Sequence, residues 1–235
     1  MVVADPAAEL LDLVRRQGDL APAVASVTDQ RAATLIRRRF ALALPPPFAG
    51  APSAHEPVRP AVSADGPAIA AVKWRAFGTS YRGGVLPDTF LDARGVVPAA
   101  SFWTTRAATP PSRRHRLLVW GRPGAVFGYL DCGPAVSDGG DGSDGREVGE
   151  VYELYVDPAH QGGGGGTRLL TGAEEWLDEA GFEQLELSAL ASNHAAHRFY
   201  RVRGWEPTGE VVPVDLGTVA FAEARYRRVR TRGPF

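Results

Sequence analysis

The segment Glu153-Leu-Tyr-Val-Asp-Pro-Ala-His-Gln-Gly-Gly-Gly-Gly-Gly-Thr-Arg-Leu-Leu170 decides the fold of this chain. Its first residues complete an aliphatic and aromatic run, Glu150 to Val156, that predicts a strand. From Thr167 to Ala180, apolar residues recur at helical spacing, and Gly181 follows as a stop signal. Glycines at a strand-to-helix junction let backbone N–H groups converge on a helix N-terminus, whose dipole attracts negative charge. The segment therefore predicts a pyrophosphate cradle rather than a flexible linker.

This cradle differs from two common nucleotide-binding loops. A Walker A loop ends in Gly-Lys-Ser/Thr, whereas Gly166 is followed here by Thr167 and Arg168. A dinucleotide fingerprint beginning at Gly162 would need a glycine at position 167. Neither nucleotide motif is present.

The composition is that of a globular protein without a global electrostatic bias. The 235 residues are 44% hydrophobic and 23% charged, and the formal net charge is −1. Such a chain has no general attraction to nucleic acid or to an anionic membrane, and no apolar stretch approaches the length of about 18 residues that suggests a membrane-spanning helix. We therefore expect neither a nucleic-acid partner nor a membrane.

The single cysteine gives information on the redox compartment and on a possible metal site. Cys132 cannot form an internal disulfide and has no Cys or His neighbours at ligand spacing. This favours a reducing compartment, a small buried hydrophobe at a strand end, and no metal site. Residues 1–6 do not combine a basic region with an apolar run, so the expected location is the cytoplasm.

Prolines divide the chain into three parts. Residues 1–50 are expected to form a helical N-terminal extension of unknown role, because apolar residues recur at helical spacing through residues 5–44. Residues 51–57 are a Pro/Ala-rich linker. Residues 58–230 form the remaining domain.

That domain has the element order of an α+β fold. Strands are expected over residues 58–62, 116–120, 125–130, 150–156, 185–190, 209–214 and 219–229, and helices from Ser63, from Pro87, around Phe102 and over residues 167–180 and 193–203. The second and third strands are joined by Gly121-Arg-Pro-Gly124 and should pair antiparallel. The arginine-rich end from Arg225 to Arg230 favours an edge strand.

Two segments together resemble the GNAT superfamily of N-acetyltransferases. The glycine segment is similar to the family's acetyl-CoA signature Gln/Arg-x-x-Gly-x-Gly/Ala, with Gln161, Gly164 and Gly166 at its defining positions. The second segment, Asn193-His-Ala-Ala-His-Arg-Phe-Tyr-Arg-Val-Arg-Gly-Trp205, is similar to the family's Asn-x-x-Ala-x-x-Phe-Tyr-x-x-x-Gly-Phe. The resemblance extends over residues 57–230.

The resemblance implies a fold, a cosubstrate and an activity. The fold is a three-layer arrangement, with a mixed, mainly antiparallel central sheet and helices on both faces. The cosubstrate is acetyl-CoA, and the reaction is direct transfer of its acetyl group to a primary amine, expected to be that of a small molecule. A protein N-terminus or lysine is the alternative acceptor, and a non-catalytic acyl-CoA-binding module is the alternative of another class. The oligomeric state stays open, a homodimer included.

By the same resemblance, the strand and the loop bind different parts of acetyl-CoA. Backbone groups of the strand bind the pantetheine arm as an added strand would, and the loop binds the pyrophosphate. The implied binding residues are Leu154, Tyr155, Val156, Gln161, Gly162, Gly163, Gly164, Gly165, Gly166, Thr167, Asn193 and Tyr200.

Two of these glycines depart from the family pattern. The family usually has a basic residue at position 163 and an aliphatic one at position 165. Without them, we expect weaker cofactor binding and a looser loop, with Arg168 as a substitute source of positive charge.

The implied chemistry needs a proton donor and a base. Tyr200 matches the family tyrosine placed near the sulfur, where a phenol can protonate the leaving thiolate; its alternative is a core role. Glu153 is the preferred base, with Glu150 close behind. Three apart, these two face opposite sides of a regular strand unless a bulge changes the parity. Either could instead be a solvated strand charge, with the proton relayed through water.

For the remaining side chains near this site, a structural role is preferred to a functional one. His194 and His197 are expected on the exposed face of their helix. The acceptor pocket should be formed by the helices between Ala64 and Arg94 and by the last two strands. Its lining candidates are Trp74, Phe77, Tyr81 and Asp88, whose first interpretation is core aromatics and a helix-start acid.

Overall fold

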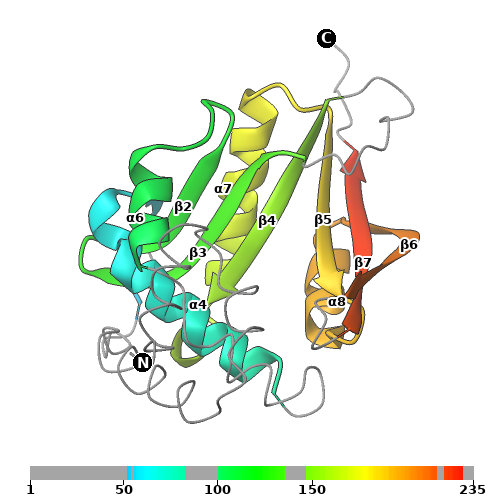
Figure 1. The fold of residues 1–235 in the computed structure, drawn as a ribbon, viewed down its shortest axis with the longest axis horizontal. Helices are drawn as coiled ribbons and strands as arrows, with labels where there is room; N and C mark the ends of the chain where they lie inside the picture. The colour runs from blue at the N-terminus through cyan, green and yellow to red at the C-terminus, as the bar shows by residue number, and fades with distance from the viewer. Residues whose placement is uncertain (1–51, 54–55, 83–99, 136–146, 216–219, 230–235) are drawn as a thin grey trace, which may run out of the picture.

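The described part of the chain folds around a seven-stranded sheet (Figure 1). The computed structural model describes residues 52–53, 56–82, 100–135, 147–215 and 220–229. The strands are β1 (Val58–Pro60), β2 (Arg116–Arg122), β3 (Ala125–Pro134), β4 (Val148–Val156), β5 (Gln184–Leu190), β6 (Glu206–Asp215) and β7 (Ala220–Val229). They lie in the order β1-β2-β3-β4-β5-β7-β6. Neighbours in this sheet pair antiparallel, except that β4 and β5 are parallel, so the mixed sheet is confirmed.

Helices cover both faces of the sheet. They are α4 (Gly66–Ser80), α6 (Ala100–Ala108), α7 (Gly165–Glu179) and α8 (His194–Arg201), with short 3-10 turns η1 (Ser63–Asp65) and η2 (Pro158–His160). Side chains of β2 alternate between the two faces, as a strand requires. Leu117 and Val119 pack in the cluster under α4 and α6, whereas Leu118 and Trp120 pack in the cluster under α7 and α8. The expected three-layer α+β arrangement is confirmed.

Most of the predicted elements form within a few residues of their expected bounds. The helix expected over residues 193–203 begins after Asn193, whose side chain accepts a hydrogen bond from the N–H of Ala196 at 3.1 Å. The arginine-rich edge strand is wrong, because β7 lies between β5 and β6. Its arginines reach carboxylates on both neighbours: Arg225 lies 3.2 Å from Glu210 of β6, and Arg227 lies 3.1 Å from Glu186 of β5.

Some predicted segments lie outside the described residues. These are the helices over residues 5–44 and the helix from Pro87. Among the helices of the described part, none has the length and apolar character needed to cross a membrane.

The strands β4 and β5 form a V that opens at one end (Figure 1). They pair where Val148–Val151 lie beside Gln184–Leu187, and they then diverge. A β-bulge marks the point of divergence: opposite β3, Asp131 faces Glu153 and the next residue faces Val151, so Tyr152 is the extra residue. The second half of β4 therefore has β3 on one side and the opening of the V on the other.

Candidate active site

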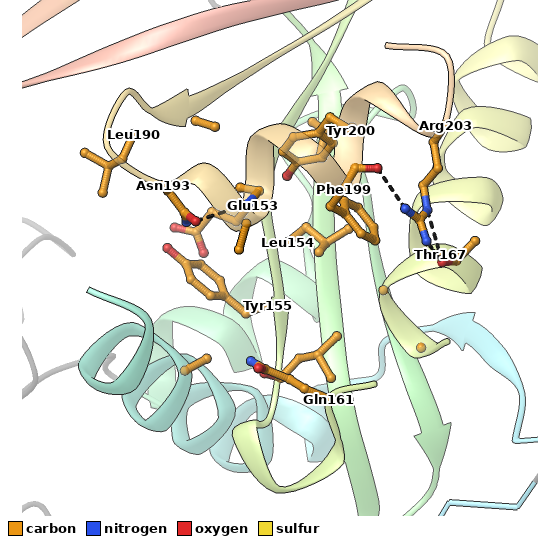
Figure 2. Close-up of a pocket in the computed structure, with 18 of the residues that line it drawn as sticks. Glu153, Leu154, Tyr155, Gln161, Thr167, Leu190, Asn193, Phe199, Tyr200 and Arg203 are labelled. Atoms are coloured by element: carbon orange, nitrogen blue, oxygen red, sulfur yellow. Dashed lines mark hydrogen bonds between the residues drawn. The ribbon is translucent and has the colours of Figure 1, made fainter. Parts of the chain in front are cut away.

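A pocket of about 650 Å³ fills the opening of the V (Figure 2). Its walls come from β4, the glycine loop with the start of α7, the end of β5 and α8. The predicted site residues that line it are Glu153, Leu154, Tyr155, Val156, Gln161, Gly162, Gly164, Gly165, Gly166, Thr167, Asn193 and Tyr200. Glu150 and Gly163 are not among its lining residues.

The wall made by β4 offers backbone donors. The N–H of Asp157 points to β3 and donates to the carbonyl of Phe127 at 2.8 Å. Because N–H groups alternate in direction along a strand, those of Val156 and Leu154 point away from β3 and toward the pocket. On this same side, the carbonyl of Val156 accepts a bond from Nε2 of Gln161 at 3.1 Å, which ties the loop to the strand. An extended ligand can therefore pair with β4 as an added strand.

The glycine loop turns β4 into α7 through left-handed backbone positions. Gly162 has φ 83° and Gly164, the N-cap of α7, has φ 80°, a region that side chains strongly disfavour. The first helical hydrogen bond runs from Arg168 N–H to the Gly164 carbonyl at 3.1 Å. The N–H groups of residues 165–167 precede that bond and point out of the helix N-terminus. This concave array of donors fits a phosphate group.

Trp120 explains sterically why position 165 is a glycine. A Cβ at position 165 would lie 2.1 Å from the indole ring of Trp120, which comes from β2 and is 1% exposed. The indole therefore fills the space of the missing aliphatic side chain. The packing that the loop lacks at this position is therefore supplied by a neighbouring strand.

Of the two arginines near the loop, Arg203 lines the pocket and Arg168 does not. The exposed Arg168 donates to the carbonyl of Glu56 at 3.2 Å and does not line the pocket. Arg203 lines it from the end of α8, and Figure 2 shows its side chain reaching Thr167 at the start of α7. Sequence analysis missed Arg203 because it occupies a variable position of the second signature.

Glu153 is fixed by partners from two elements. Its Oε1 lies 2.5 Å from Nζ of Lys73 on α4, and its Oε2 accepts a bond from the Tyr129 hydroxyl on β3 at 2.6 Å. The side chain is 27% exposed and lines the pocket. The bulge at Tyr152 changes the strand parity and places Glu150 on the same face as Glu153, but beyond the pocket.

Tyr200 projects from α8 into the pocket with its ring buried. The ring contacts Trp205 and Tyr226 at centroid distances of 6.4 Å and 5.8 Å. Burial, with the nearby Tyr81 and Tyr226 phenols, raises the pKa of Tyr200 above its ordinary value. The phenol is therefore protonated at neutral pH and available as a donor.

His197 lies on the inner side of α8, so its expected exposure is wrong. Its Nε2 lies 3.0 Å from the carbonyl of Ala191, and its Nδ1 lies 2.7 Å from the Tyr226 hydroxyl. Since a carbonyl only accepts, Nε2 carries the hydrogen and Nδ1 accepts from Tyr226. The arrangement holds α8 on β7 beneath Tyr200. His194 is exposed, as expected.

Two phenols border the pocket beside Glu153. The hydroxyl oxygens of Tyr81, at the end of α4, and Tyr155, on β4, lie 3.5 Å apart. Burial raises the pKa of both phenols, and the Glu153 carboxylate raises them further. Phe77 packs edge-on against Tyr81 at 4.7 Å, but it is half-buried and lies outside the two hydrophobic clusters described above, so it is not the core aromatic expected. Of the lining candidates for the acceptor, Tyr81 lines this pocket, Trp74 and Phe77 do not, and Asp88 lies outside the described residues.

Comparisons with known proteins agree with this architecture. The profile of the acetyltransferase (GNAT) family matches residues 86–205. Three solved structures share the fold. The PaiA N-acetyltransferase of Thermoplasma acidophilum, in complex with coenzyme A, has 15% identity and a TM-score of 0.57, with 74% of this chain and 98% of that chain covered. The ribosomal-protein-alanine N-acetyltransferase of Brucella melitensis has 21% identity and a TM-score of 0.54, with 74% and 99% covered.

The third is YncA of Salmonella typhimurium, a putative acetyltransferase with its cofactor acetyl-CoA. It has 21% identity and a TM-score of 0.51, with 75% of this chain and 95% of that chain covered. At these identities the likeness concerns the fold. A comparison with curated protein sequences found no match.

Proposed function

The chain belongs to the acetyltransferase (GNAT) family, and on that premise we propose that it transfers the acetyl group of acetyl-CoA directly to a primary amine of a small molecule. One observation carries the proposal: an open strand edge, a donor-rich helix N-terminus and a buried phenol line a single pocket. Each matches a different part of an acyl-CoA thioester. Structures of the same fold with coenzyme A and acetyl-CoA support this cosubstrate.

Different residues of the pocket would bind different parts of acetyl-CoA. The N–H groups of Leu154 and Val156 would pair with the amides of the pantetheine arm. The N–H groups at the start of α7 would hold the pyrophosphate. When bound there, acetyl-CoA supplies an acyl group activated as a thioester, with a thiolate as its leaving group.

In this proposal, two side chains move protons during the transfer. The amine must lose a proton to attack, and the Glu153 carboxylate, held by Lys73 and Tyr129, can accept it at Oε1 or Oε2, directly or through one water. The Tyr200 phenol can donate its proton to the departing sulfur. Glu153 is favoured over Glu150 because Glu153 lines the pocket.

The chemistry beside Glu153 favours a compact, basic acceptor. The carboxylate attracts an ammonium group, and the Tyr81 and Tyr155 hydroxyls offer hydrogen bonds to a polar amine. Transfer to a protein N-terminus or lysine would use the same proton movements. The test therefore includes peptide acceptors.

Release of free thiol from acetyl-CoA, measured across a panel of small primary amines and of peptides, tests the proposal. Turnover on at least one small amine supports it. Turnover on peptides alone would move the acceptor to proteins. Micromolar binding of acetyl-CoA by calorimetry without turnover on any amine would favour a binding module, and no binding would overturn the assignment altogether.

Replacing the phenol tests the proton donor. Tyr200→Phe should lower kcat about 100-fold or more, while the Kd for acetyl-CoA changes little, because the ring remains and only the proton-donating hydroxyl is removed. Tyr226→Phe is the matched control, since it removes a neighbouring buried hydroxyl that bonds to His197 and does not line the pocket. An unchanged kcat in Tyr200→Phe would remove Tyr200 from this role.

A further inference from the structure

The glycine loop has no basic side chain, although it is the proposed pyrophosphate site. Residues 161–167 read Gln-Gly-Gly-Gly-Gly-Gly-Thr. Among the described residues that line the pocket, Arg203 is the one arginine or lysine. It lies at the mouth between α7 and α8, where the first turn of α7 begins (Figure 2).

Arg203 is held in place from two elements. Its Nη1 donates to the carbonyl of Phe199 at 2.7 Å, and its guanidinium stacks over the Phe199 ring at 3.8 Å. Its Nε donates to Oγ1 of Thr167 at 3.1 Å, and Nη2 bonds to the same oxygen. The Phe199 ring in turn lies 3.4 Å from the Cβ position of Gly166. The charge is thus fixed beside the helix N-terminus before any ligand arrives.

The guanidinium of Arg203 has N–H groups left that can bind a ligand. It carries five N–H groups, and the bonds within the described residues use one on each nitrogen. One N–H on each terminal nitrogen remains. No carboxylate is paired with Arg203 in the described part of the chain, so its charge is not neutralised there. An arginine with two free donors and an unneutralised charge is suited to a phosphate oxygen.

We propose that Arg203 binds a phosphate group of acetyl-CoA, and that it supplies, from the turn that follows α8, the positive charge that the glycine loop lacks. This rests on the proposed function and names the residue that performs one part of it. Its bond to Thr167 also couples α8 to the loop, so phosphate binding draws on both helices.

Calorimetry with CoA tests the proposal in the absence of catalysis. Arg203→Met should raise the Kd for CoA about 10- to 100-fold, because a charged hydrogen bond to the ligand is lost. Pantetheine, which carries no phosphate, should bind both proteins equally. Arg168→Met is the matched control: it removes an arginine of the first turn of α7 that lies outside the pocket, and the Kd should stay within about threefold.

Dephospho-CoA distinguishes the two phosphate sources. An equal loss with CoA and dephospho-CoA assigns Arg203 to the pyrophosphate, and a loss with CoA alone assigns it to the 3′-phosphate; either supports the proposal. An unchanged Kd for CoA in Arg203→Met, or an equal loss with pantetheine, would overturn it. If the unaltered protein itself fails to bind CoA, the proposed function fails instead.

A second variant separates charge from architecture. Gly163 has no left-handed backbone, and its Cβ position has no neighbour closer than 3.7 Å, so a side chain fits there. Adding Gly163→Arg to Arg203→Met should restore most of the lost CoA affinity, because it returns a cation to the loop. If Arg203 only braced Thr167 and Phe199, Gly163→Arg would raise the CoA affinity by the same factor in the unaltered protein as in Arg203→Met, whereas the proposal predicts a larger gain in Arg203→Met; equal factors would contradict the proposal.

Discussion

The glycines of the loop differ in the physical constraint that acts at each position. Gly162 and Gly164 adopt positive φ angles, whereas Gly165 is excluded from carrying a side chain by Trp120. Gly163 is constrained by neither effect. These four glycines therefore occupy three kinds of position, which should tolerate substitution differently.

Substitution at position 165 tests the contact with Trp120. Gly165→Ala should lower the free energy of unfolding by about 1–3 kcal/mol, because its Cβ overlaps the indole. Gly163→Ala is the control and should be nearly neutral. Chemical denaturation measures both. Adding Trp120→Leu to Gly165→Ala should recover part of the free energy of unfolding that Gly165→Ala loses. If Gly165→Ala and Gly163→Ala were equally stable, the indole would not constrain the loop.

Sequence patterns could predict the residues that act through the backbone. Gln161, Gly164 and Asn193 stand in signatures because local geometry requires them. Trp120 and Arg203 act on the loop from elements far away in the sequence. No local spacing relates them to it, so only the packed structure identifies them.

At the scale of elements, the bulge in β4 is the feature that makes the site. It turns β4 away from β5 and places Glu153 on the pocket wall. The choice between Glu150 and Glu153 was unresolved by the sequence because a bulge is a property of strand pairing. Strand β7 is a second case in which strand pairing could not be predicted from the sequence. Its arginines suggested an edge strand, whereas β7 pairs with β5 and β6 inside the sheet.

The contact between α6 and β3 should make stability depend on pH. Asp131 of β3 is 6% exposed and accepts bonds from Arg106 of α6 at 3.0 Å. Burial raises the pKa of Asp131 to about 6, from an ordinary 3.8. Between these values the folded state keeps a proton that the unfolded state has lost, so stability falls as pH rises, by about 2–3 kcal/mol in total.

Denaturation curves between pH 4 and pH 7 measure this slope. Asp131→Asn should remove it, because the amide does not titrate. Glu147→Gln is the control, since that carboxylate is 61% exposed and pairs with Arg114 on the surface. A slope in Asp131→Asn equal to that of the unaltered protein would assign the pH dependence to other groups.

At the scale of the molecule, two parts of the sheet meet at the short pairing of β4 and β5. One part carries α4, α6 and α7, and the other carries α8 (Figure 1). Side chains tie the two parts together: Glu174 of α7 accepts a hydrogen bond from the Trp205 indole at 2.8 Å and lies 2.7 Å from Arg228 of β7. The order of elements was predictable from the sequence, but the opening between the parts was not, because it depends on where pairing stops.

Binding of CoA in this opening is the central claim, and amide hydrogen exchange followed by NMR tests it most directly. Saturating CoA should slow exchange at Leu154, Val156 and residues 165–167, whose N–H groups face the pocket. Tyr155, whose N–H faces β3, is the internal control and should not change. CoA that binds without protecting Leu154 and Val156 would contradict the claim that β4 receives it as an added strand.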